Sequence, residues 1–170
     1  MKLISLLEKL EYTCLQGSTD QEVKNVVYDS RKVEEGSLFI CIRGAVVDGH
    51  KFVPDVVAKG AKVLIVEEAV EAPEDVTVIL VKDTRYAMAF ISAAYFGYPA
   101  EKLKTIGITG TKGKTTTTYM VKSILENAGY KVGLIGTIEA IIGDKVIPAK
   151  NTTPESYVIQ EYFHEMVEAG

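Results

Sequence analysis

Apolar and polar positions along the first hundred residues follow two periods in turn, which predicts strands and helices that succeed one another. Short apolar runs with strand character are Val23–Tyr28, Ser37–Ile42, Lys62–Val66 and Val76–Val81. The last two are apolar throughout, as strands are when both faces of their sheet are covered. Segments with helical spacing are Lys2–Leu10, Phe52–Lys59 and a longer one from Asp83 to about Gly97. The pattern predicts a compact α/β unit.

A second pattern of the same kind follows a boundary that we place at Pro99. It predicts a buried strand at Lys104–Thr109 and a helix from about Lys114 to Asn127. A further strand at Lys131–Ile135 is the expected parallel partner of the first, reached by a right-handed crossover.

The last forty residues predict a hairpin and a helix. The hairpin pairs residues 138–142 with 145–147 around Gly143-Asp144. The final helix is expected to run to Ala169, with Thr153 as its N-cap and Pro154 at its first position. The fold class is therefore α/β, as a small domain over residues 1–99 and an incomplete P-loop domain over residues 100–170.

The segment between the predicted strand and helix of the second unit has the features of a phosphate-binding loop. It reads Gly110-Thr111-Lys112-Gly113-Lys114-Thr115-Thr116. The two glycines carry no Cβ, so backbone N–H groups can converge on an anion, and the helix N-terminus faces the same point. Lys114 supplies a fixed positive charge, and the Thr115 hydroxyl can ligate a Mg²⁺ ion held by phosphates.

The spacing is a variant of the Walker A motif, because Ile108 stands where the consensus has its first glycine. A tight turn with a surface lysine is the alternative interpretation. We favour nucleotide binding, since glycines, lysine and threonine coincide between a strand pattern and a helix pattern. We expect ATP and Mg²⁺ as cofactors, Lys114 as the catalytic cation and Thr115 as a metal ligand.

Composition and charge exclude several classes of protein. The net charge of the 170 residues is −4, which gives no electrostatic basis for nucleic-acid binding. The N-terminal segment is too short for a membrane span, so we expect a cytoplasmic protein with no membrane partner. Cys14 and Cys41 have neither metal-ligand nor disulfide spacing, and we expect both to be buried in a protein of a reducing compartment.

Three separated motifs resemble the Mur ligase family, and within it most closely the MurE branch. The segments Asp29-Ser30-Arg31, Gly36-Ser37-Leu38-Phe39 and Asp48-Gly49-His50-Lys51-Phe52 together resemble the uridine-nucleotide domain. The glycine-rich loop resembles the ATP loop of the family. Asn151-Thr152-Thr153-Pro154-Glu155 resembles the segment that MurE members use to bind the muramoyl-peptide substrate. The likeness spans nearly the whole chain.

The resemblance implies an ATP-dependent amide-bond ligase of peptidoglycan precursor synthesis. Such an enzyme adds a diamino acid, L-lysine or meso-diaminopimelate, to UDP-N-acetylmuramoyl-L-alanyl-D-glutamate through an acyl phosphate. The remaining magnesium ligands, a carbamylated lysine and the amino-acid domain of the family would lie beyond Gly170. We therefore expect this chain to be inactive alone and to self-associate through its incomplete second domain.

The resemblance also implies roles for individual residues. The ATP-binding residues would be Gly110, Thr111, Lys112, Gly113, Lys114, Thr115 and Thr116. Those that bind the UDP-N-acetylmuramoyl-peptide would be Tyr28, Ser30, Asn151, Thr152 and Thr153, with backbone contacts from residues 45–47. Each has a structural alternative: Ser30 as part of a turn, and Thr152 and Thr153 as a helix cap. His50 is expected to brace its loop rather than bind a ligand.

Three other functions stay open from the sequence. The related MurF ligase is the nearest, although MurF members do not typically carry a segment like Thr152-Thr153-Pro154. A stand-alone module that binds a nucleotide or a UDP-sugar without turnover is the second. A P-loop GTPase is the third, but no guanine-specific Asn/Thr-Lys-x-Asp signature follows the loop.

Overall fold

The computed structural model describes residues 1–44 and 47–170, which form two compact units, Met1–Tyr95 and Phe96–Gly170. The division lies just before the Pro99 boundary expected from the sequence. The reason is that Pro99–Lys102 form a 3₁₀ helix, η3, which packs against the C-terminal helix α5 (Ser156–Glu168) of the second unit. The aromatic ring of Phe96 also contacts the rings of Tyr157 and His164 on α5.

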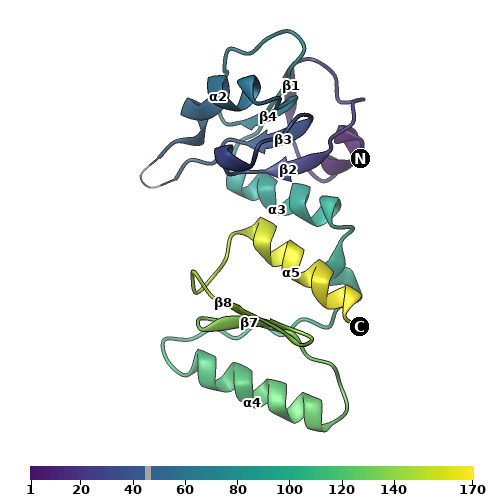
Figure 1. The fold of residues 1–170 in the computed structure, drawn as a ribbon, viewed down its shortest axis with the longest axis vertical. Helices are drawn as coiled ribbons and strands as arrows, with labels where there is room; N and C mark the ends of the chain where they lie inside the picture. The colour runs from purple at the N-terminus through teal and green to yellow at the C-terminus, as the bar shows by residue number, and fades with distance from the viewer. Residues whose placement is uncertain (45–46) are drawn as a thin grey trace. The chain divides into compact units, whose positions relative to one another are not determined.

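The first unit is built on a five-stranded sheet of order β1-β5-β4-β3-β2 (Figure 1). Its strands are β1 (Thr13–Gln16), β2 (Asn25–Val27), β3 (Ser37–Ile40), β4 (Val63–Val66) and β5 (Thr77–Leu80). Strands β2 to β5 are parallel, whereas β1 joins the edge of β5 antiparallel. The four strands expected in this unit are confirmed. The fifth, β1, was not predicted because its mostly exposed residues carry no apolar period.

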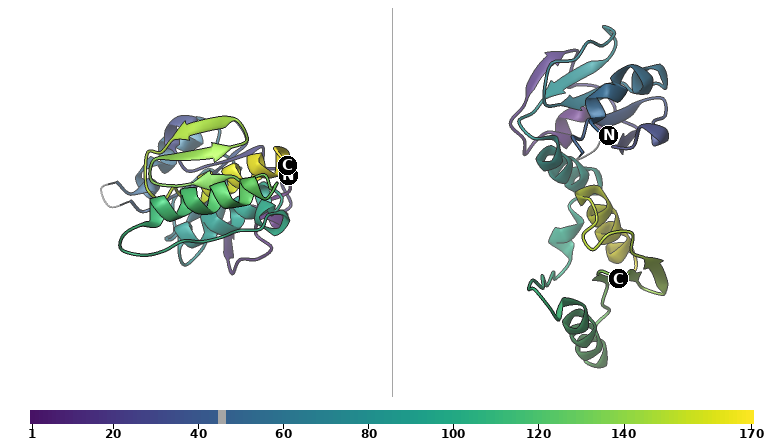
Figure 2. Two further views of the ribbon diagram at one scale, coloured as in Figure 1. Left: turned by 90° about the horizontal axis from the view of Figure 1, so that it is seen from below. Right: turned by 90° about the vertical axis from the view of Figure 1, so that its left-hand side faces the viewer.

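Helices cover both faces of this sheet. They are α1 (Leu3–Leu6), α2 (Val53–Ala58) and α3 (Thr84–Tyr95), with 3₁₀ turns η1 (Ser30–Lys32) and η2 (Gly49–Phe52). Figures 1 and 2 show α2 and α3 on opposite sides of the strands. Alternate strand residues such as Phe39 and Leu64 belong to the core that contains α2. Their neighbours Ile40 and Ile65 are equally buried, which explains strands that are apolar throughout.

The first helix is shorter than the predicted Lys2–Leu10. It covers only Leu3–Leu6, and Leu7 is its C-cap. A single turn gains little from its own backbone hydrogen bonds, because helix nucleation is costly. The turn is held by tertiary contacts instead, since Leu3, Leu6 and Leu7 are fully or almost fully buried.

The second unit contains a three-stranded antiparallel sheet of order β6-β7-β8 between two helices (Figures 1 and 2). Its elements are α4 (Lys114–Asn127), β6 (Leu134–Ile135), β7 (Glu139–Ile142), β8 (Lys145–Pro148) and α5. The helix after the glycine-rich loop and the hairpin at Gly143-Asp144 are confirmed as predicted. In Figure 1, α4 and α5 lie on opposite faces of the sheet.

The predicted strand at Lys104–Thr109 is wrong, and so is the parallel crossover that depended on it. These residues form no strand, and β6 pairs antiparallel with β7 instead. Strand β6 has only two residues, and its ladder in the described part of the chain is with β7 rather than with residues 104–109. Ile106 is consequently 62% exposed. Together with Ile108, it borders a groove of about 140 Å³ against α4 and β6.

Two further expectations need correction. Helix α5 begins at Ser156 with Glu155 as its N-cap, so neither Thr153 nor Pro154 has the predicted role. Cys14 is exposed on edge strand β1 rather than buried. Cys41 is buried as expected, and that burial raises the pKa of its thiol to about 12. Within the described residues, every helix is too short or too polar to cross a membrane.

Candidate functional site: a phosphate-type loop at the start of α4

The glycine-rich loop leads directly into α4. Gly113 is the N-cap residue with a φ of 78°, and Lys114 is the first helical residue. A side chain at Gly113 would meet open space but would strain the backbone, because positive φ disfavours residues with a Cβ. The Nζ atom of Lys114 donates a hydrogen bond of 2.7 Å to the carbonyl oxygen of Gly110, which folds the loop back on itself. A short, tightly turned loop therefore precedes the helix.

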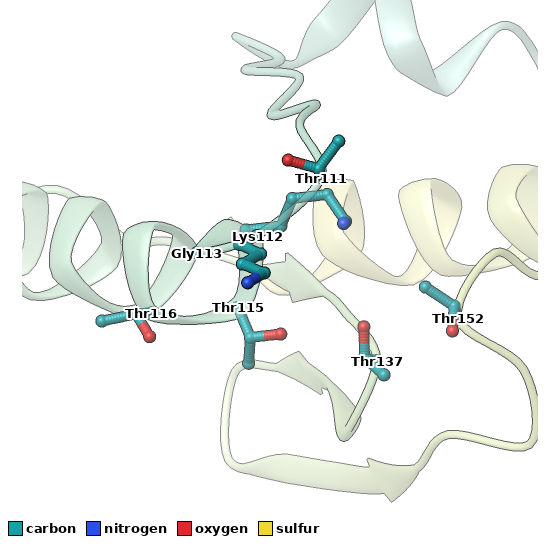
Figure 3. Close-up of a pocket in the computed structure, with 8 residues that line it drawn as sticks. Thr111, Lys112, Gly113, Thr115, Thr116, Thr137 and Thr152 are labelled. Atoms are coloured by element: carbon teal, nitrogen blue, oxygen red, sulfur yellow. The ribbon is translucent and has the colours of Figure 1, made fainter.

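A pocket of about 460 Å³ opens at this point, and all of its lining residues belong to the second unit (Figure 3). They are Thr111, Lys112, Gly113, Lys114, Thr115, Thr116, Thr137 and Thr152. The lining offers lysine ammonium groups and threonine hydroxyls. None of these described lining residues is a carboxylate. The pocket is therefore suited to an anion.

The backbone adds to this preference for an anion. The amide of Thr117 donates to the carbonyl of Gly113, the first hydrogen bond of α4. The amides of residues 114–116 precede that bond, so they have no partner within the helix. Together with the positive end of the helix dipole, they make the N-terminus of a helix a ready anion site. The arrangement fits the oxygens of a phosphate chain.

The predicted peptide-binding segment is only partly at this pocket. Thr152 lines it, whereas Asn151 and Thr153 are exposed beside it and are not part of its lining. Thr137 lines the pocket although the sequence analysis did not single it out. The signal that could have identified it is a polar residue directly after Gly136, in a tight turn between two apolar strands.

The turn that presents Thr137 is anchored on both sides. The amide of Gly136 donates to the carbonyl of Glu139 at 3.0 Å, and the amide of Ala149 donates to the carbonyl of Ile138 at 2.9 Å. The phenol of Tyr119, on α4, donates to Oε1 of Glu139 at 2.6 Å. This hydrogen bond raises the pKa of Tyr119, so the phenol remains protonated and the bond persists at neutral pH.

In the first unit, Tyr28 and Ser30 lie at the end of β2 and the start of η1, and both are partly buried. The turn here is closed by Asp29. Its carboxylate accepts hydrogen bonds from the Arg31 amide at 3.0 Å and from the Arg31 guanidinium at 2.9 and 2.7 Å. These bonds lower the pKa of Asp29 to about 2. Because Asp29 makes the turn, the turn does not account for the hydroxyl of Ser30.

The loop after β3 is braced by a buried histidine, as the sequence predicted. The backbone amide and Nδ1 of His50 contact Oδ1 of Asp48 at 3.0 and 2.6 Å, and its Nε2 accepts the amide of Glu67 at 2.9 Å. Glu68 lies close enough to Asp48 and His50 for a metal site. However, both ring nitrogens are engaged, and Arg43 pairs with both carboxylates. The cluster is therefore a structural brace.

The nucleotide contacts expected from residues 45–47 cannot all be located. Ala45 and Val46 lie outside the described residues. Val47 is 51% exposed, and its carbonyl accepts a hydrogen bond of 2.9 Å from the amide of Gly44.

Comparisons with known proteins give concordant results. The family described as "Mur ligase family, catalytic domain" matches residues 22–96, and the family described as "Mur ligase middle domain" matches residues 108–170. The UDP-N-acetylmuramoyl-L-alanyl-D-glutamate–2,6-diaminopimelate ligase of Clostridium perfringens is 54% identical over 170 residues, which are 100% of this chain and 35% of the relative. The ligase of the same name from Geobacillus kaustophilus is 44% identical, with 100% and 34% covered.

Solved structures agree with the sequence matches. A structure of a UDP-N-acetylmuramoyl-L-alanyl-D-glutamate–2,6-diaminopimelate ligase superposes with a TM-score of 0.76 at 22% identity, over 100% of this chain and 34% of that one. At 22% identity, this similarity shows that the two proteins share a fold. MurF from Acinetobacter baumannii gives a TM-score of 0.61 at 30% identity, over 96% of this chain and 32% of that one.

The chain spans about a third of the length of the curated relatives that it matches. The two family matches do not overlap, and together they cover most of the chain in the order that the motifs predicted. The chain belongs to the Mur ligase family and carries parts of its N-terminal and middle domains.

Proposed function

We propose that this chain is the nucleotide-binding part of an ATP-dependent ligase that extends UDP-N-acetylmuramoyl-L-alanyl-D-glutamate by one diamino acid. The observation that carries the proposal is the anion-type pocket where the glycine-rich loop enters α4. Eight relatives that are 42–54% identical carry the name of a 2,6-diaminopimelate ligase. We therefore favour meso-diaminopimelate over L-lysine as the amino acid, and this branch over MurF.

In the proposed reaction, an oxygen of the substrate carboxylate attacks the γ-phosphorus of ATP. The bond from that phosphorus to the bridging oxygen breaks, ADP leaves, and an acyl phosphate remains. The amine of the diamino acid then attacks the acyl carbon and displaces inorganic phosphate. The first step needs positive charge around the transferring phosphoryl group. Lys114 and the free amides of residues 114–116 would supply it.

The hydroxyl of Thr115 would help to hold a Mg²⁺ ion, which would supply further positive charge at the phosphates. The residues present fit this role only in part. Thr115 supplies one neutral hydroxyl oxygen, and no carboxylate is among the described residues that line the pocket. Mg²⁺ prefers octahedral coordination by oxygens, commonly carboxylates, phosphates and water. We therefore propose that this chain binds ATP but does not turn it over alone.

The other site residues extend the same proposal. Residues 1–99 would hold the UDP end of the substrate, with Tyr28 and the hydroxyl of Ser30 in contact with it. Asn151, Thr152 and Thr153 would contact its peptide-bearing part. The substrates named here are cytoplasmic metabolites, so we propose that the protein acts in the cytoplasm. Self-association through the second unit stays a prediction.

The proposal is tested by calorimetric titration of the 170-residue chain with ATP, as wild type and as Lys114→Ala. Loss of a fixed charge at a phosphate costs about 2–4 kcal/mol, so affinity should fall by about thirtyfold or more. Lys122→Ala is the matched control. Lys122 lies on the same helix, outside the pocket, and pairs with Glu126. Equal affinity of wild type and Lys114→Ala would refute the nucleotide site.

A phosphate-release assay separates this proposal from a stand-alone binding module. Supplied with ATP, UDP-N-acetylmuramoyl-dipeptide and meso-diaminopimelate, this chain should release no phosphate above background. The full-length protein should release phosphate, because a ligase turns ATP over, whereas a binding module would release none at any length.

A further inference from the structure

The wall of the pocket opposite the glycine-rich loop contains a threonine that none of the motifs includes. Thr137 is exposed, and no hydrogen bond of its hydroxyl is found within the described part of the chain. In Figure 3 it lies between Thr115, the second residue of α4, and Thr152, which precedes α5. The hydroxyl oxygen of Thr115 is directed toward Thr137 in this view. The hydroxyl of Thr137, which makes no hydrogen bond within the described residues, therefore faces the space where the phosphate chain would lie.

The position of Thr137 relative to the loop is set by a chain of hydrogen bonds. Helix α4 begins with the lysine of the loop and carries Tyr119 little more than one turn further on. Tyr119 donates to Glu139 at 2.6 Å, and Glu139 in turn accepts the amide of Gly136 at 3.0 Å. Gly136 immediately precedes Thr137 in the sequence. One helix thus holds both walls of the pocket, which is the preorganisation that a ligand contact requires.

We propose that Thr137 is a substrate-binding residue that donates its hydroxyl hydrogen to the terminal phosphate of ATP. The inference rests on the proposed ATP site. The loop amides at the start of α4 would approach the phosphate chain from one side of the pocket. A group on the opposite wall is left to contact the end of the phosphate chain. A neutral hydroxyl suits that end, since it can donate to a phosphoryl oxygen before transfer without adding a competing charge.

The alternative is that Thr137 is no more than a polar residue of a turn. Turn positions favour small polar residues for local reasons, and such a residue would affect binding only through folding. The two interpretations differ in one measurable respect. A contact to the terminal phosphate changes the affinity for ATP but not for ADP, whereas a structural effect changes both.

The test is calorimetric titration of the 170-residue chain with ATP and with ADP, as wild type, Thr137→Val and Thr137→Ser. Thr137→Val keeps the shape and removes the hydroxyl. It should weaken ATP binding by about tenfold, or about 1.4 kcal/mol, and leave ADP binding unchanged. Thr137→Ser keeps the hydroxyl and should bind ATP as wild type does. Thr117→Val is the control, because Thr117 is an exposed threonine of α4 outside the pocket lining.

The possible results separate this inference from the ATP site itself. If wild type binds neither nucleotide, the proposed ATP site is refuted and the inference falls with it. If wild type binds both and Thr137→Val matches it for ATP, only the inference is overturned. Equal losses for ATP and ADP, or a loss that Thr137→Ser does not restore, also overturn it. Circular dichroism of each variant checks that the second unit remains folded.

Discussion

Replacement of His50 by alanine should destabilise the first unit by about 3 kcal/mol. His50 is 8% exposed, and its ring accepts the amide of Glu67 through Nε2. Without it, that partly buried amide has no other partner among the described residues, at a cost of about 1–3 kcal/mol. The contact from Nδ1 to the carboxylate of Asp48 is also lost, and a hydrogen bond to a charged group contributes about 1.5–3 kcal/mol. Asp48 is partly exposed and can be rehydrated, which holds the total near the lower end of the summed range.

The assay is urea unfolding of the 170-residue chain, followed by far-ultraviolet circular dichroism. With a denaturant slope of about 1–3 kcal/mol/M for a small domain, the urea midpoint for unfolding of the first unit should fall by about 1–3 M. Lys82→Ala is the control, because its ion pair with Glu11 is 92% exposed at both side chains, and such pairs contribute little. A change below about 0.5 kcal/mol for His50→Ala, comparable to an ordinary surface substitution, would refute the brace.

Two further predictions concern the loops. Gly113→Ala should weaken ATP binding by about five- to thirtyfold in calorimetry, because a Cβ at a φ of 78° costs about 1–2 kcal/mol. Gly107→Ala is the control and should leave ATP binding unchanged, because its Cβ also meets open space but its φ is not positive. The carboxyl of Asp29 should titrate at about pH 2 by NMR, and Arg31→Ala should raise that midpoint toward 3.8. The pKa of Asp29 is lower in the folded state than in the unfolded state, so its contact with Arg31 stabilises the fold above about pH 4, and this stabilisation is lost as the pH falls toward 2. A midpoint for Asp29 that Arg31→Ala leaves unchanged would contradict the prediction.

The sequence predicted the first unit well because its signals were local and redundant. The strands at Lys62–Val66 and Val76–Val81 were found within one residue of their ends. Their apolar runs are continuous because residues on both faces are buried, and their short length and β-branched residues favour strands over buried helices. The edge strand β1 gave no such signal. Its residues are held by pairing to β5 rather than by burial, and pairing leaves no pattern in the sequence.

The second unit shows the limit of this reasoning. Lys104–Thr109 has a strand-like composition, but a strand exists only through its partner, and the partner's register is not encoded locally. The residues of the glycine-rich loop were predicted from their chemistry, which is local. Thr137 was not, because its place opposite that loop depends on the length of α4 and on the turn between β6 and β7. Both are properties of the packed unit rather than of a motif.

The pocket in this chain is held by hydrogen bonds rather than by a strand that precedes the loop. The strand that precedes a phosphate-binding loop usually anchors it, yet here residues 104–110 form no strand. The described structure supplies other restraints, namely the contact from Lys114 to Gly110 on one side and the contact from Tyr119 to Glu139 on the other. The second contact ties the turn between β6 and β7, which carries Thr137, to α4. Nucleotide affinity should therefore depend on this turn as well as on the loop, although the turn contains none of the residues by which the loop is recognised in sequence.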